Sequence, residues 1–123
     1  MKISILLPYK ENFSSEYAGA VSIFINAVNR KSVYKKEITV YGNTQYKKIL
    51  SKNYYNLSLK NKSIIESSSS FYVNNFIKKK NVISSDIIEI HNRPNYIKKI
   101  LLLKKGKKFL YFHNNPLEMK GST

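Results

Sequence analysis

The sequence predicts an α/β fold in which helices cover both faces of a parallel sheet. Short apolar runs alternate with helix-like segments along the 123 residues, and together they predict the order β-α-β-α-β-α-β-α-β. The strand-like runs are continuously apolar instead of alternating with polar residues, which is typical of strands buried on both faces. The length suits one domain, and the sequence shows no internal repeat and no linker.

Five apolar runs predict the strands of this sheet. They cover residues 2–8, 37–42, 54–59, 86–90 and 108–112. Pro8 closes the first run and Gly42 closes the second, because both residue types interrupt regular structure. The run at 54–59 is the weakest of the five.

The first helix is predicted from apolar residues at helical spacing after a polar loop. Tyr17, Val21, Phe24 and Val28 share one face, and the helix should end near Arg30, where cations suit a carboxyl end. Residues 45–52 predict a second, short helix.

Two further helices are predicted in the second half of the chain. The serines of 66–70 form a loop and a cap before a helix at 71–81, whose apolar face comprises Tyr72, Val73, Phe76 and Ile77. In the segment 92–106, Asn92 lies near the cap, Pro94 in the first turn and Gly106 just past the end, as expected for a helix.

The composition limits the classes of function. The absence of cysteine excludes disulfides, thiolate zinc sites and a thiol nucleophile, and it suits a reducing cytoplasm. The apolar runs are too short to span a bilayer, and residues 1–11 do not form a signal peptide. The net charge is +15, but only Arg30 and Arg93 are arginines. We interpret most lysines as a solvated face, some of which attract anionic lipids or phosphorylated substrates.

Both histidines of the sequence occupy the same local context. His91 and His113 each follow an apolar run, and each is followed by asparagine and, soon after, by proline. In a sheet with strand order 3-2-1-4-5, ligands bind beyond the carboxyl ends of the first and fourth strands. Both histidines, Glu11 and Gly19 should meet there. His113 could exchange a hydrogen bond with a substrate hydroxyl or have a structural role only.

The other candidate residues each have two interpretations. Gly19 could let helix amides approach an anionic group, or it could only provide clearance between helix and sheet. Glu11 is either the carboxylate of the site or an exposed loop charge. Arg93 either pairs with an acidic or phosphorylated acceptor or lies on a helix surface, which we favour. The scarcity of acidic residues disfavours a metal-dependent mechanism.

Three blocks of the sequence resemble a known family. "MKISILLPYKENFSSEYAGAVS", "DIIEIHNRPNYIKKIL" and "FLYFHNNPLEMKGS" are similar to the amino-terminal half of bacterial family 4 (group 1) glycosyltransferases of the GT-B fold. The likeness extends over essentially all 123 residues, although 43–80 is generic. Many members have a Gly-Gly pair in the first loop, where this chain has Ala18 before Gly19.

The resemblance implies a Rossmann-like, doubly wound domain spanning 1–123. It would be the incomplete, acceptor-side half of an enzyme whose donor-binding domain is absent from this chain. By this resemblance His113 would be catalytic, beside the transferred sugar. His91 and Asn92 would line the acceptor side, and Gly19 would approach the donor diphosphate or the acceptor. Glu11, Arg93 and Asn114 complete the expected substrate-binding residues.

The implied activity is that of a retaining, metal-independent hexosyltransferase without a cofactor. It would move a sugar from a nucleotide-sugar to a glycan or lipid-linked acceptor, in the assembly of surface polysaccharide or lipopolysaccharide. The expected location is the cytoplasm, with contact to the anionic inner face of the membrane and no specific nucleic-acid partner. Alone, this chain is expected to be inactive.

Two alternatives remain open at the level of sequence. A small basic module could bind nucleic acid or another polyanion, which the +15 charge favours and the scarcity of arginine disfavours. A stand-alone flavodoxin-like regulatory domain would share the fold, since fold does not determine function.

Overall fold

Five parallel strands form a single sheet in the computed structural model, which describes residues 1–113. The strands are β1 (Ile3–Leu6), β2 (Ile38–Gly42), β3 (Tyr54–Asn56), β4 (Ile87–His91) and β5 (Lys107–Tyr111). Their order is β3-β2-β1-β4-β5, and every adjacent pair is parallel. The α/β class, the doubly wound Rossmann-like sheet and the predicted strand order are therefore confirmed.

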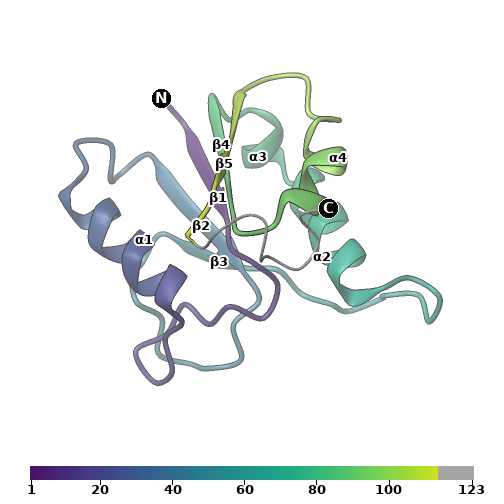
Figure 1. The fold of residues 1–123 in the computed structure, drawn as a ribbon, viewed down its shortest axis with the longest axis horizontal. Helices are drawn as coiled ribbons and strands as arrows, with labels where there is room; N and C mark the ends of the chain where they lie inside the picture. Colours follow the sequence, from purple (N-terminus) through teal and green to yellow (C-terminus); the bar gives the residue numbers. More distant parts are fainter. Residues whose placement is uncertain (114–123) are drawn as a thin grey trace.

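Helices cover the two faces of this sheet (Figure 1). The helix α1 (Ala20–Lys31) lies on one face. The opposite face carries α2 (Ser68–Ile77), α3 (Lys80–Ile83), the short 3₁₀ helix η1 (Pro94–Tyr96) and α4 (Ile97–Ile100). Two separate apolar cores result. The larger core lies beneath α2 and α4, and the smaller one lies between α1 and the strands β1 and β2.

The strand order places a reversal of direction between β1 and β4. From β1 the chain winds outward through β2 to β3, and it then crosses over to β4 on the other side of β1. Loops from neighbouring strands diverge at such a reversal, and they leave a crevice at the carboxyl ends of the strands. The segments after Leu6 and after His91 begin at this edge.

The helix predicted at 45–52 does not form, and that prediction was wrong. These residues run as a loop that pairs with the segment after β1, where Ser14 and Ile49 form an isolated antiparallel bridge. The Glu16 carboxylate accepts hydrogen bonds from the amides of Lys47 and Lys48 at 3.1 and 2.9 Å. The Leu50 amide, which a helix would bond internally, donates instead to the Phe13 carbonyl oxygen at 3.2 Å.

The predicted face of the first helix was wrong for Phe24 and Val28, although Val21 is buried as predicted. The buried residues of α1 are Val21, Ser22 and Ile25, whereas Phe24 and Val28 are exposed. Tyr17 precedes the helix, which begins at Ala20. The apolar spacing had been counted from a residue outside the helix, and this rotated the expected face.

The two remaining helix predictions are confirmed only in part. The helix predicted at 71–81 forms as α2 and α3 and begins at Ser68, inside the predicted serine loop, and the helix predicted at 92–106 ends at Ile100, well before Gly106. The Ser67 hydroxyl caps α2 by accepting the Ser70 amide at 3.1 Å, and the predicted apolar face packs in the core. Residues 92–106 form only the short helices η1 and α4, with Pro94 in the first turn as predicted. Gly106 has φ +93° and leads into β5, where a Cβ atom would lie 2.7 Å from the Ser85 carbonyl oxygen.

Candidate functional site

A connected row of polar side chains lies at the carboxyl ends of β4 and β5. His91 is the last residue of β4, and Glu89 lies two residues earlier on the same face of that strand. His113 follows the end of β5 by two residues. The register of the two strands pairs His91 with Tyr111, and this pairing brings the segments carrying the two histidines together.

The two imidazole rings are joined by a hydrogen bond. His91 Nδ1 and His113 Nε2 are 2.8 Å apart, and His91 Nε2 lies 3.2 Å from Glu89 Oε2. The rings also stack, with centroids 5.1 Å apart and an interplanar angle of 28°. Two side chains of β4 and one from the segment after β5 therefore form one continuous chain, Glu89–His91–His113.

The carboxylate at one end of this chain determines which nitrogen atoms carry protons. An ionised Glu89 can only accept, so His91 Nε2 carries a hydrogen. In a neutral His91, Nδ1 is then an acceptor, and His113 Nε2 donates to it. Partial burial and the neighbouring His91 lower the pKa of His113 below its usual 6.5, so the ring is neutral at pH 7. Its remaining nitrogen, Nδ1, is a hydrogen-bond acceptor.

Asn92 holds the turn that carries the second histidine. Its side-chain oxygen accepts the main-chain amide of His113 at 2.7 Å, and its own amide donates to the Tyr111 carbonyl at 2.9 Å. Asn92 has φ +56°, a left-handed conformation that asparagine tolerates better than most residues. This residue is buried, so it positions His113.

Glu11 occupies the amino end of α1. Its Oε2 accepts the amide of Ser22, in the first turn of the helix, at 3.0 Å. Gly19, the residue before the helix, makes room, because a Cβ atom there would lie 1.9 Å from the same oxygen. The charge of Glu11 also raises the pKa of His113, although burial and His91 have the larger effects. Both expected residues thus contribute to the site, and the anion at the helix end belongs to the protein itself.

Arg93 and Asn114 are the remaining expected substrate-binding residues. The Arg93 guanidinium donates to the carbonyl oxygen of Asn92 at 2.7 Å and is partly buried. Its hydrogen bond is thus to the preceding residue of the chain. Asn114 lies outside the described residues.

A pocket of about 250 Å³ opens beside the histidine chain, between α1 and the sheet. Glu89, His91 and Tyr111 line one side, and Phe24 and Val28 of α1 line the other. Phe24 also contacts His113 edge-to-face, with centroids 4.9 Å apart. The pocket therefore combines aromatic and aliphatic surface with the acceptor groups of the cluster.

Sequence reasoning missed Glu89, Tyr111 and Phe24. A signal for Glu89 was present, because Glu89 and His91 are the only polar residues of a five-residue strand and alternate positions share a face. Tyr111 and Phe24 carried no comparable signal. Their roles depend on the strand register and on the rotation of α1, which the spacing of apolar residues did not determine.

Two general features of the described chain bear on the chemistry. Within residues 1–113, no three histidine, cysteine or acidic side chains gather in a way that could hold a metal ion. In the same range, no helix combines the length and apolarity that a bilayer crossing requires.

Comparison with known proteins gives no relative. No family model, no curated protein and no solved structure matches this chain.

Proposed function

We propose that the chain is the acceptor-side domain of a metal-independent glycosyltransferase. The enzyme would transfer a sugar from a nucleotide-sugar to a glycan or lipid-linked acceptor, in surface polysaccharide or lipopolysaccharide assembly. The observation that carries the proposal is the hydrogen-bonded chain Glu89–His91–His113 at the carboxyl edge of the sheet. The resemblance of the two histidine blocks to family 4 glycosyltransferases supports it.

The histidine chain suits the recognition of a sugar hydroxyl. His113 Nδ1 would accept a hydrogen bond from the hydroxyl, and a proton shared with this nitrogen would be stabilised through His91 by the Glu89 carboxylate. The aromatic rings of Phe24 and Tyr111 flank His113 at centroid distances of 4.9 and 5.0 Å. Such apolar surface can pack against the C–H groups of a sugar ring.

The position of Glu11 supports the acceptor side as the role of this domain. Its carboxylate accepts an amide of α1, and a diphosphate placed there would meet a like charge at short range. The same carboxylate can accept hydrogen bonds from hydroxyl groups. We therefore assign the amino end of α1 to the acceptor, and we expect the nucleotide phosphates to be bound away from Glu11.

Release of nucleoside diphosphate from a panel of nucleotide-sugars, with candidate acceptors and EDTA present, tests this function. The protein should be assayed as its gene encodes it. We expect turnover in EDTA, and a loss of about 10- to 100-fold in kcat/KM for His113→Ala, as for one substrate hydrogen bond of ~1.5–3 kcal/mol.

The matched control for this assay is Phe112→Ala, which alters the neighbouring exposed residue and should retain most of the activity. Turnover that is lost in EDTA, or equal turnover by His113→Ala and the unaltered protein, would contradict the proposal.

A second candidate function, polyanion binding, is favoured by the +15 charge. It predicts binding to duplex DNA that falls steeply with salt and does not depend on His113.

A further inference from the structure

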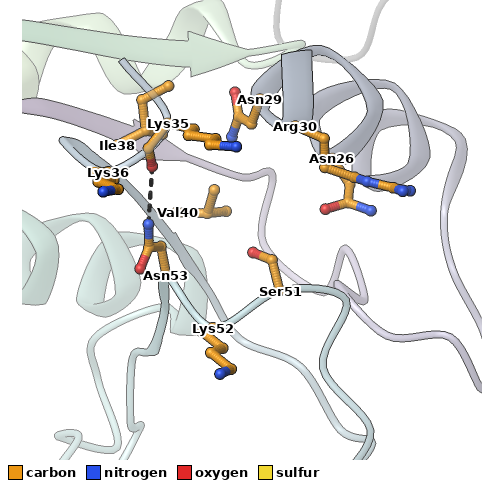
Figure 2. A pocket seen from close by; sticks show the side chains of 10 residues that line it. All are labelled: Asn26, Asn29, Arg30, Lys35, Lys36, Ile38, Val40, Ser51, Lys52 and Asn53. Atoms are coloured by element: carbon orange, nitrogen blue, oxygen red, sulfur yellow. Dashed lines mark hydrogen bonds between the residues drawn. The ribbon is translucent and has the colours of Figure 1, made fainter. Parts of the chain in front are cut away.

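The protein has a second concave surface, which adjoins the pocket beside the histidines and shares Asn29 and Ile38 with it. A pocket of about 280 Å³ lies between α1, the start of β2 and the residues before β3. Its lining comes from three segments, 26–30, 35–40 and 51–53, and Figure 2 shows their side chains around the pocket. Because β2 begins at Ile38 and β3 at Tyr54, the pocket lies toward the amino ends of the strands. The histidine cluster lies at their carboxyl ends.

The lining of this pocket is strongly basic. It includes four cations and no carboxylate: Arg30, Lys35, Lys36 and Lys52. Within residues 1–113 none of the four forms an ion pair, since the two ion pairs of that range involve other residues. The carboxyl end of α1 contributes a partial negative charge of about one half, which four positive charges outweigh. The pocket therefore favours an anion.

The uncharged residues that line the pocket indicate the chemistry of the rest of the ligand. Asn26, Asn29 and Ser51 offer amide and hydroxyl groups, and Ile38 and Val40 supply buried apolar surface. In Figure 2, Lys35 extends toward Asn29, whereas Lys52 points outward. Amides and a hydroxyl suit hydroxyl groups of a ligand, and the aliphatic side chains suit its C–H groups.

A hydrogen bond connects two of the segments that line the pocket, and the volume of the pocket limits the size of a ligand. Asn53 Nδ2 donates to the Lys35 carbonyl oxygen at 2.9 Å, which connects the segments before β2 and β3 (Figure 2). A volume of about 280 Å³ is at the lower end of small-molecule sites, which hold ~300–1,000 Å³. The pocket thus suits one charged group on a small body.

We propose that this pocket binds a phosphate group carried on a small polyol. A free sugar phosphate and a phospholipid headgroup present the same chemistry. The adjoining loop exposes Val33 by 88% and Tyr34 by 45%, and these side chains would contact lipid if the phosphate belongs to a membrane. This pocket shares Asn29 and Ile38 with the pocket beside the histidines, but of these two pockets the four cations line only this one. Substitution of the cations therefore tests this proposal separately from the proposed transferase function.

Two binding measurements distinguish the sources of the phosphate. Calorimetry with glycerol phosphate tests the free ligand, and sedimentation with phosphatidylglycerol vesicles, compared with phosphatidylcholine vesicles, tests the headgroup. We expect binding in at least one arm. The double variant Lys35→Gln/Lys36→Gln should weaken that binding about tenfold, as expected for losing ~0.7 kcal/mol per cation.

The matched control is Lys98→Gln/Lys104→Gln, which removes the same charge from exposed positions that line none of the pockets described above. It should weaken binding less than about twofold, because screening by salt limits long-range attraction. If both double variants weaken binding equally, the loss of net charge alone explains the effect, and the proposal is overturned. Absence of binding in both arms would also overturn it.

Discussion

His91 and His113 differ in how far each ring is enclosed, and this difference separates their roles. His91 is 2% exposed and has hydrogen-bond partners at both ring nitrogens. His113 is partly exposed, and one of its ring nitrogens is bonded to His91. Under the proposed function, contact with the substrate therefore falls to His113. His91 and Glu89 would then be positioning residues that fix its ring and its tautomer.

The pKa of His113 predicts a pH dependence of stability. Because partial burial and His91 lower this pKa below 6.5 in the folded protein, the unfolded chain binds a proton more readily. The contribution of His113 to stability is therefore complete above pH 6.5, and it is lost as the pH falls through the unfolded pKa toward the lowered folded value. The urea midpoint should fall between pH 8 and pH 5, and it should fall less in His113→Asn. An identical fall in both proteins would contradict this assignment.

At the scale of elements, the amino end of α1 is capped by a residue outside the helix, Glu11. Gly19 precedes the helix and has no capping side chain, and Glu11 reaches the first turn from the preceding loop. A carboxylate at this end is favourable because it satisfies an amide and complements the helix dipole. The backbone of Gly19 is extended, with φ −76°, so the glycine is required for space and not for its conformation.

A double-mutant cycle tests this arrangement. Gly19→Ala should destabilise the protein by ~1–2 kcal/mol, because the new methyl group displaces the Glu11 carboxylate from its helix amide. In a Glu11→Ala background the same substitution should cost much less, since the clash is gone. Chemical unfolding of the four proteins provides the comparison. An equal cost of Gly19→Ala in both backgrounds would show that Glu11 does not occupy this space.

The sequence could predict which segments are regular, but not how each one is rotated or what it pairs with. The central strands β1, β2 and β4 were recognisable because continuous apolar runs reflect burial on both faces. The edge strands β3 and β5 are largely exposed. The buried face of α1 was not, because Tyr17 fitted the spacing although the helix begins at Ala20. The loop at 45–52 has a helix-like composition, but Glu16 and the backbone near Ser14 bind it from outside. Such partners are invisible to local patterns.

At the scale of the whole molecule, topology determines where the polar residues meet. A parallel sheet with its order reversed beside β1 brings the loop bearing Glu11 and the ends of β4 and β5 to one edge. This rule predicted that Glu11, Gly19 and the two histidines would gather. It could not predict Glu89 or the direct bond between the histidines, because these depend on side-chain direction and strand register.

The clustering of cations around the second pocket is another feature that the sequence alone did not predict. The net charge of +15 was evident from composition, and most lysines were interpreted as a solvated face. The fold concentrates four of the cations around one pocket, although they come from three segments of the chain. Only the packing of α1 against β2 and the residues before β3 creates that pocket.

The most direct test of the central claim is a long-range ¹H–¹⁵N spectrum of the two histidines at pH 7.5, recorded with and without saturating sugar acceptors. We predict that His113 is neutral, that both rings carry a hydrogen at Nε2, and that an acceptor sugar shifts the His113 Nδ1 resonance far more than either nitrogen of His91. Protonation of His113 at Nδ1, or a His113 resonance that no sugar moves, would contradict the account.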